Sequence, residues 1–167
     1  TIWAIHIYRQ SFQMEFATIT PDRGDRPKFL EHCKWQLSRM NTKPAKSYFI
    51  TMPPKNGEVD LVPRIQAGVE LARQDGIDLV FIIENDDFMP ATYFDNIDPA
   101  AEFIGEFGTV YYNLKNREYQ HDPHFGHSSL FTTGFRTSSL DGFIWPKSDE
   151  RFLDISLWAY AKRTRKR

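Results

Sequence analysis

The sequence has only one cysteine, no long apolar run and almost no net charge. The lone Cys33 excludes an internal disulfide, and its place in a helical pattern favours packing over nucleophilic catalysis. No apolar stretch approaches the roughly 18 residues of a membrane span, and nothing at the start resembles a secretion signal. We therefore expect a cytoplasmic protein with no membrane span. Since 21 Lys and Arg face 22 Asp and Glu, there is also no strong nucleic-acid signal.

The 167 residues are 41% apolar, enough for one core and too few for two ordinary domains. We expect a single domain over residues 14–162 and a basic tail over residues 163–167. Two interpretations of residues 1–13 stay open. Because Met14 opens a strand-like run, residues 1–13 are either an extension foreign to the natural protein or an extra strand.

Apolar periodicity predicts a strand, helix, strand, helix, strand order in the first half, which is typical of a parallel α/β unit. The expected strands are Met14–Thr20, Ser47–Met52 and Ile77–Ile83, and the expected helices are Lys28–Met40 and a segment from Arg64 to the Asp75-Gly76 stop signal. The second half is less regular. There we expect strands at Gly108–Leu114 and Ser129–Thr133, a short helix from Pro90, and a helix at Phe152–Lys162.

An acidic turn, Glu84-Asn85-Asp86-Asp87, follows the most apolar of these strands. In an open parallel sheet, ligands bind at the carboxyl ends of the strands, so this turn is expected at the site. Three adjacent carboxylates repel one another, and a hard cation such as Mn²⁺ or Mg²⁺ relieves that repulsion. A solvated acidic loop without a metal is the alternative that stays open.

Four segments together resemble GT-A glycosyltransferases, particularly family 2-like ones. The segments are FATITPDR from Phe16, Arg64 through the acidic turn to Asp87, PATYF from Pro90, and FLDISLW from Phe152. The resemblance implies a single-domain α/β sandwich of the nucleotide-diphospho-sugar transferase kind, with a mostly parallel central sheet and helices on both faces. One departure is Glu84, which stands where the family usually has aspartate and makes Asp86 the stronger ligand candidate.

The resemblance also implies a function. It implies a hexosyltransferase-like enzyme that moves a sugar from a UDP- or GDP-sugar to an acceptor hydroxyl with inversion, with Asp154 as the catalytic base. Transfer with retention, in which Asp154 would orient the acceptor, stays open as an alternative. The implied nucleotide-sugar-binding residues are Thr20, Pro21, Asp22, Arg23, Arg64, Glu84, Asn85 and Asp86. The implied metal ligands are Asp86, Glu84 and His127, holding Mn²⁺ or Mg²⁺.

Other hypotheses stay open. A non-catalytic nucleotide-sugar or carbohydrate-binding module is one, and a nucleotidyltransferase is another, although only Gly24 is present where such an enzyme has a Gly-rich phosphate loop. Asp154 is also explained as an ordinary first-turn helix aspartate, and Arg23 and Arg26 as solvated loop charges. The three histidines at 121, 124 and 127 have a spacing that also suits a zinc site.

Overall fold

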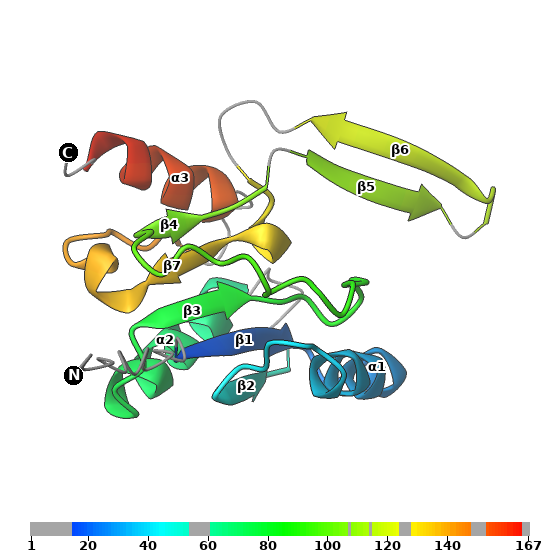
Figure 1. Ribbon diagram of the computed structural model, residues 1–167, viewed down its shortest axis with the longest axis horizontal. Helices are drawn as coiled ribbons and strands as arrows, with labels where there is room; N and C mark the ends of the chain where they lie inside the picture. Colours follow the sequence, from blue (N-terminus) through cyan, green and yellow to red (C-terminus); the bar gives the residue numbers. More distant parts are fainter. Residues whose placement is uncertain are drawn as a thin grey trace, which may run out of the picture.

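A mixed five-stranded sheet lies at the centre of the structure, a computed structural model that describes residues 15–53, 61–106, 108–113, 115–123, 128–147 and 153–164. The elements follow the chain as β1 (Phe16–Asp22), α1 (Pro27–Ser38), β2 (Lys46–Thr51), α2 (Leu61–Gln74), β3 (Leu79–Ile82), β4 (Phe103–Ile104), β5 (Gly108–Asn113), β6 (Glu118–Pro123), η1 (Leu130–Thr132), β7 (Gly134–Arg136), η2 (Thr137–Leu140) and α3 (Leu153–Arg163). In space the central strands lie in the order β2-β1-β3-β7-β4, and β5 and β6 form a separate hairpin (Figure 1).

The sheet is parallel on one side and antiparallel on the other. β1 pairs in parallel with both β2 and β3, whereas β7 lies antiparallel to β3 and β4. The α/β class is therefore confirmed, and the sheet is mixed, because β7 runs against the other four of its five strands. The chain turns through η1 beside the carboxyl end of β3, where the amide of Ile82 donates to the carbonyl of Thr133 over 3.0 Å, and β7 then runs back along β3.

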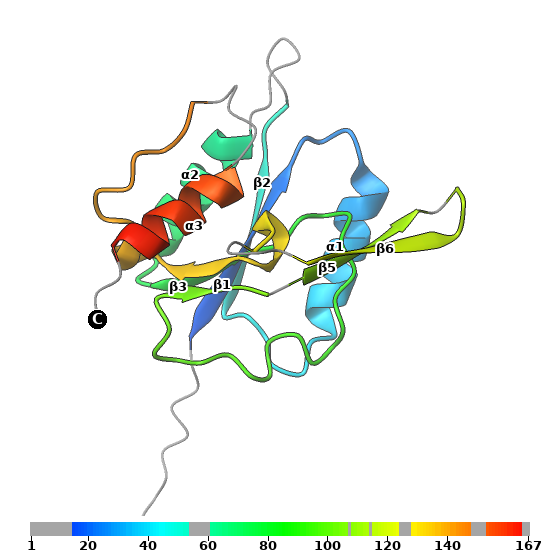
Figure 2. The ribbon, with the colours of Figure 1, turned by 90° about the horizontal axis from the view of Figure 1, so that it is seen from above.

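Helices cover both faces of the sheet, as expected. α1 packs on one face, and α2 and α3 pack on the other (Figure 2). Alternate residues of β3 pack on opposite faces of the sheet. Val80 and Ile82 pack with α2 and α3, and Leu79 and Phe81 pack with α1. A strand covered on both faces needs apolar residues at every position. This requirement explains the unbroken apolar run that the sequence shows there.

The helices of the first half follow their sequence signals closely. α2 ends at Gln74, and Gly76 adopts a φ of 75°, as the Asp75-Gly76 stop signal predicts.

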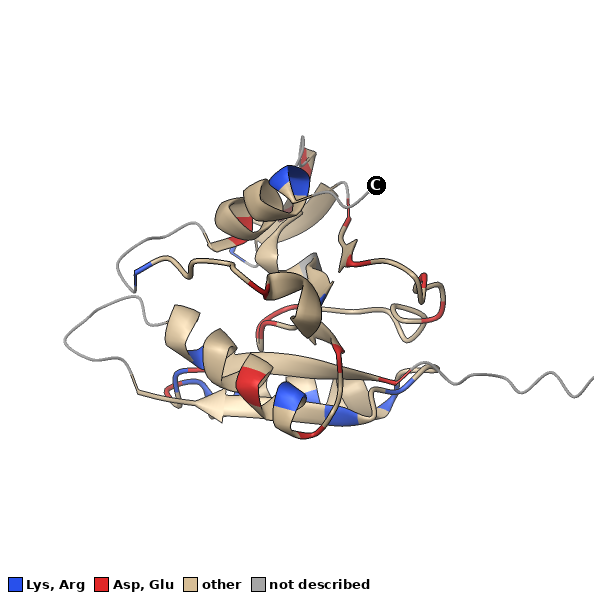
Figure 3. Ribbon diagram, turned by 90° about the vertical axis from the view of Figure 1, so that its left-hand side faces the viewer, with Lys and Arg blue, Asp and Glu red and all other residues tan. Residues whose placement is uncertain are grey.

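Acidic and basic residues are interspersed along the same helices and loops (Figure 3). Within the parts of the chain that the structure describes, no helix combines the length and the apolar character needed to cross a membrane.

Two predictions for the second half of the chain are wrong. The segment Ser129–Thr133 is not a strand, because Leu130–Thr132 forms the 3-10 helix η1 and the strand begins only at Gly134. Pro90 does not start a helix, since residues 91–96 form consecutive turns. The local apolar content suited a strand at the first segment and a helix at the second. The structures differ from these predictions because Leu130 and Phe94 pack into the two core layers.

Gly68 lets α2 lie close against β1, and its replacement gives a first testable prediction. A methyl group at position 68 would lie 2.4 Å from Cγ2 of the fully buried Ile19. Although alanine is the better helix former, we expect Gly68→Ala to lower the free energy of unfolding by about 1–3 kcal/mol through overpacking. Urea denaturation measures this loss.

The control is the same substitution in an Ile19→Ala background, where the clashing Cγ2 is gone. There the nearest atom of residue 19 is its Cβ, 3.2 Å from the added methyl group, so Gly68→Ala should cost clearly less stability than in the wild type. An equal loss in both backgrounds would show that the contact with Ile19 is not the cause.

Candidate functional site

Three carboxylates gather where the chain leaves β3. Glu84, Asp86 and Asp87 each offer a ligand atom, and these atoms all lie within 4.8 Å of one another. The amide of Ile83 donates to the carbonyl of Ile19 in β1 over 2.9 Å, which fixes the start of the turn to the sheet. The cluster therefore lies at the carboxyl edge of the parallel strands, where α/β sheets bind ligands.

The three carboxylates do not share one environment. Burial raises the pKa of Glu84 to about 7, with contributions from the charges of Asp86 and Asp154 and an opposing one from Arg26. Burial also raises the pKa of Asp87 to about 8, and Glu84 and Asp86 raise it further. Oδ2 of Asp87 is buried and has no hydrogen-bond partner among the described residues. An oxygen-only donor set with an unsatisfied buried oxygen fits a hard divalent cation such as Mg²⁺ or Mn²⁺.

The guanidinium of Arg26, at the start of α1, contacts this cluster. Its Nη1 lies 2.6 Å from Oδ2 of Asp86, and its guanidinium also lies over the ring of Phe29 at 5.6 Å. Both side chains of the ion pair are about two-fifths exposed, at 42% and 41%. Arg26 is thus a partly solvated charge that is paired, and it places a guanidinium beside the carboxylate that the sequence favours as metal ligand.

Asp22 joins the ends of three chain segments. Its Oδ1 accepts a hydrogen bond from the side-chain amide of Asn85 over 2.9 Å, and its Oδ2 accepts from the hydroxyl of Thr51 and from the amide of Gly24. Asp22 and Asn85 are each only 2% exposed. These bonds connect the carboxyl ends of β1 and β2 to the acidic turn, so Asp22 and Asn85 shape the site from within.

The other residues of the expected nucleoside loop divide by burial. Thr20 and Pro21 are buried within β1, and the Thr20 hydroxyl lies 3.7 Å from Sγ of Cys33 in the core. Arg23 is half exposed and pairs with Asp25 at 3.5 Å. Of the four residues from Thr20 to Arg23, Arg23 is therefore the one whose side chain reaches solvent beside the site.

Arg64 is placed differently from what its sequence position suggested. α2 is described from Leu61, so Arg64 lies within the first turn rather than opening the helix. It is 3% exposed, and its guanidinium donates to the carbonyl of Met52 through Nε at 2.9 Å and also through Nη2. Arg64 thus fixes the chain after β2 to α2.

Asp154 comes from the far end of the chain to the same edge. It is the second residue of α3, it is half-buried, and its Oδ1 accepts from the amide of Ile155 over 2.8 Å. After burial and Asp86, its charge is the next cause of the raised pKa of Glu84. The fold therefore brings Asp154 and the acidic turn together.

No protein-family model and no curated protein matches this chain. The chemistry of the site therefore has to be argued from its own residues.

Gln36 is a contributor that the sequence did not reveal. Its Nε2 donates to the carbonyl of Asp87 over 2.7 Å, and its Oε1 accepts from the amide of Met89 over 2.8 Å. The side chain is buried, so α1 holds the chain that follows the acidic turn. In the sequence Gln36 is a polar residue inside a helical repeat, and no local pattern distinguishes it.

Tyr93 and Glu106 extend the site beyond the acidic turn. Burial raises the pKa of Tyr93 above its usual range, and the charges of Glu106 and Asp87 add to this shift. Burial also raises the pKa of Glu106. Glu106 lies between β4 and β5, where the sequence offered no motif.

His127 lies outside the described residues, as do residues 1–13.

The pKa of Asp87 gives a second prediction, on stability and pH. Its carboxyl titrates near 3.8 in an unfolded chain and at about 8 in the folded protein. Between these values the folded state binds more protons, so the free energy of unfolding falls as the pH rises. Asp87→Asn removes this contribution. We expect the wild type to lose on the order of 1 kcal/mol or more relative to Asp87→Asn between pH 5 and 8, measured by urea denaturation.

Asp141→Asn is the matched control, because that side chain is 83% exposed and lies away from the turn. Saturating Mn²⁺ should also remove the slope of the wild type, since the cation favours the ionised carboxylates. A pH slope that is the same in the wild type and in Asp87→Asn would contradict the assigned burial of this group.

Proposed function

We propose that this protein is a metal-dependent glycosyltransferase of the GT-A type, which moves a sugar from a nucleotide-diphosphate donor to an acceptor hydroxyl. The observation that carries the proposal is the convergence of Asp154 from α3 with the carboxylates of the turn after β3. Three of the segments that resemble the family lie on β1, on α2 with β3, and on α3. β1 supplies Asp22, the turn after β3 supplies the three carboxylates, and α3 supplies Asp154. The parallel order β2-β1-β3 followed by the antiparallel β7 is compatible with such a domain.

Asp86 and Glu84 are the residues that would hold Mn²⁺ or Mg²⁺, with Asp87 adding an oxygen and His127 as a further candidate. A bound cation of this kind acts as a Lewis acid that neutralises charge on a departing diphosphate. Arg26 is the group of this chain best placed to pair with phosphate oxygens, because its guanidinium already binds a carboxylate of the turn. Asp22 and Asn85 keep the turn in shape.

Asp154 is the base in this proposal. Its carboxylate takes the proton of the acceptor hydroxyl while the acceptor oxygen bonds to the anomeric carbon of the sugar. The bond from that carbon to the diphosphate breaks, and its electron pair leaves with the diphosphate. Attack on the face opposite the leaving group inverts the anomeric configuration. The hydrogen bond from the amide of Ile155 orients the Asp154 carboxylate.

Calorimetric titration with UDP and with GDP, each with and without Mn²⁺, tests the donor site. We expect one of the two nucleotides to bind at least about tenfold more tightly with Mn²⁺, because a cation held by the carboxylates would neutralise charge on the diphosphate. Release of nucleoside diphosphate from UDP-glucose, UDP-galactose, UDP-N-acetylglucosamine and GDP-mannose tests turnover. Equal affinity with and without Mn²⁺ would rule out the metal role. Binding without any release would instead favour the non-catalytic module.

A further inference from the structure

The β5–β6 hairpin projects from the body of the domain over the edge where β1 and β3 end (Figures 1 and 2). Every residue of β6 is exposed, and three tyrosines and a valine of the hairpin are at least half exposed: Val110, Tyr111, Tyr112 and Tyr119. An isolated two-stranded hairpin is marginally stable in water, and exposed aromatic residues at such a position usually serve an interaction.

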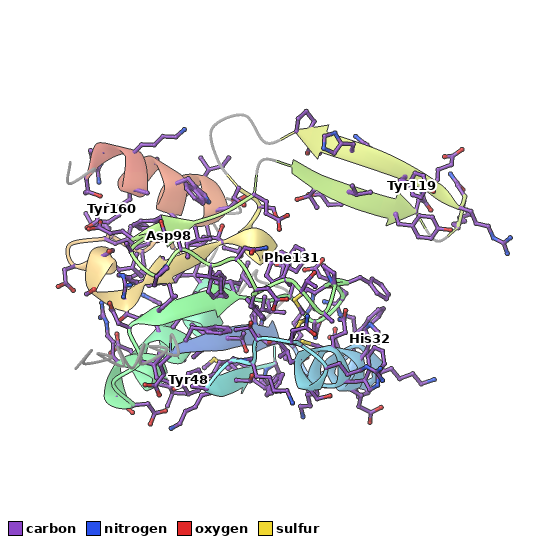
Figure 4. All side chains as sticks on the ribbon, viewed as in Figure 1. His32, Tyr48, Asp98, Tyr119, Phe131 and Tyr160 are labelled. Carbon is purple, nitrogen blue, oxygen red and sulfur yellow. The ribbon has the colours of Figure 1, made fainter. Side chains whose placement is uncertain are left out.

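The register of the hairpin separates its side chains into two faces. Tyr111 lies opposite Gln120, and Tyr112 lies opposite Tyr119. Because side chains alternate along a strand, one face carries Thr109, Tyr111, Asn113, Glu118, Gln120 and Asp122, which we call the Tyr111 face. The other carries Val110, Tyr112, Tyr119 and His121, which we call the Tyr112 face. The rings of Tyr112 and Tyr119 pack at 5.7 Å, and Figure 4 labels Tyr119 on the outer part of the hairpin.

The Tyr111 face is turned towards the body of the domain, because Oγ1 of Thr109 on this face donates to Oγ of Ser129 over 3.4 Å. Ser129 directly precedes η1, which lies beside the carboxyl end of β3. After burial and the neighbouring Asp122, the charges that act on the Tyr111 hydroxyl and raise its pKa are those of Asp87, Glu84 and Asp154. These three carboxylates come from the turn after β3 and from α3. The contact of Thr109 and the charges that reach Tyr111 both put this face on the side of the hairpin that is turned towards the acidic edge.

The composition of the Tyr111 face identifies what it suits. It offers one aromatic ring surrounded by a hydroxyl, two carboxamides and two carboxylates, and the cations of the hairpin, Lys115 and Arg117, lie in its turn outside the paired residues. An aromatic ring can pack on the apolar face of a sugar, carboxamides can donate hydrogen bonds to its hydroxyls and accept from them, and carboxylates can accept from them. Polyanions need cations instead, and the carboxylates of this face repel them.

We infer that the Tyr111 face binds the acceptor, and that the acceptor is a neutral carbohydrate held between this face and Asp154. The inference rests on the proposed glycosyltransferase function and adds its substrate class. Tyr111 packs against a sugar ring, while Asn113 and Gln120 bind hydroxyl groups. The acceptor hydroxyl that reacts is the one presented to Asp154.

The first experiment measures binding without any donor, by saturation-transfer NMR with methyl glycosides and disaccharides of neutral hexoses and N-acetylhexosamines. These probes have no aromatic group that could itself stack on tyrosine. Tyr111→Ala should weaken binding about tenfold, and Tyr111→Phe should keep most of it because the ring remains. Tyr112→Ala is the matched control, since this residue is adjacent, 50% exposed against 51% for Tyr111, and on the opposite face.

The second experiment measures transfer to the same glycosides by mass spectrometry, together with slow donor cleavage by water. Tyr111→Ala should raise the KM for the acceptor about tenfold, whereas Tyr112→Ala should leave both that KM and cleavage by water within about twofold. A hydroxymethylated DNA oligonucleotide serves as the anionic acceptor and should not be glycosylated.

The outcomes separate the two proposals. Three results would overturn the inference, even if Mn²⁺-dependent donor cleavage establishes the transferase. They are failure of every neutral glycoside to bind, equal losses of binding in Tyr111→Ala and Tyr112→Ala, and transfer to the DNA oligonucleotide in preference to the glycosides. Conversely, glycoside binding that depends on Tyr111 in a protein that cleaves no donor would support the carbohydrate surface and refute the transferase.

Discussion

Asp86→Ala is expected to lower Mn²⁺-dependent cleavage of the donor nucleotide sugar by about 100-fold or more. Asp86 is the most exposed carboxylate of the cluster, and the lengthened arm of Glu84 cannot replace it at the same position. Under the proposed function its loss removes a ligand of the cation, and it leaves Arg26 without the partner that now lies 2.6 Å away. A coupled assay for released nucleoside diphosphate measures the rate, and calorimetry measures the loss of Mn²⁺-dependent nucleotide affinity.

The control for this prediction is Asp141→Ala. Asp141 is also an exposed aspartate that pairs with an arginine, Arg73 at 3.4 Å, but it lies beside η2 and far along the chain from the acidic turn. Its replacement should leave both rate and affinity within about twofold, as expected of a solvated surface pair. Asp86→Asn keeps the size of the side chain and tests charge alone. If Asp86→Ala retains full activity, the metal assignment is wrong.

The parts of the fold that sequence predicted best are those where one local pattern fixes the outcome. β3 lies inside the predicted Ile77–Ile83 run, because a strand covered by helices on both faces must be apolar throughout. α1 and α2 likewise match their three- and four-residue apolar spacings within a few residues. The acidic turn was found in the same way, since it follows directly from the end of a recognisable strand.

The residues that sequence missed depend on contacts between distant segments. β7 is only three residues long, and its antiparallel place beside β3 depends on the turn at η1. Gln36 and Glu106 sit in no motif, and each joins the site only because the fold brings α1 and the chain after β4 to one edge. Asp22 was singled out as a ligand for the nucleoside, but its two carboxylate oxygens are occupied by Asn85, Thr51 and Gly24.

Asp154→Asn is expected to have the second large effect, and one of a different kind. The amide keeps the shape of the side chain but cannot take a proton, so kcat for transfer should fall by about 100- to 10,000-fold. The affinity for nucleotide with Mn²⁺ should stay within about threefold, because Asp154 acts on the cluster only through its charge and solvent screens part of that interaction. Rapid-quench measurement of product and calorimetry of binding, on the same preparation, give the two quantities.

This split between rate and affinity distinguishes the base from an ordinary helix residue. If Asp154 only stabilises the first turn of α3, Asp154→Asn should change the melting temperature slightly and leave kcat intact. Asp98→Asn is a suitable control, since that carboxylate also accepts a hydrogen bond from a nearby backbone amide, at Ala100 over 2.9 Å, and belongs to no part of the site. A loss of kcat confined to Asp154→Asn, with nucleotide affinity retained, assigns proton transfer to the one acidic side chain that α3 contributes to the edge formed by β1 and β3.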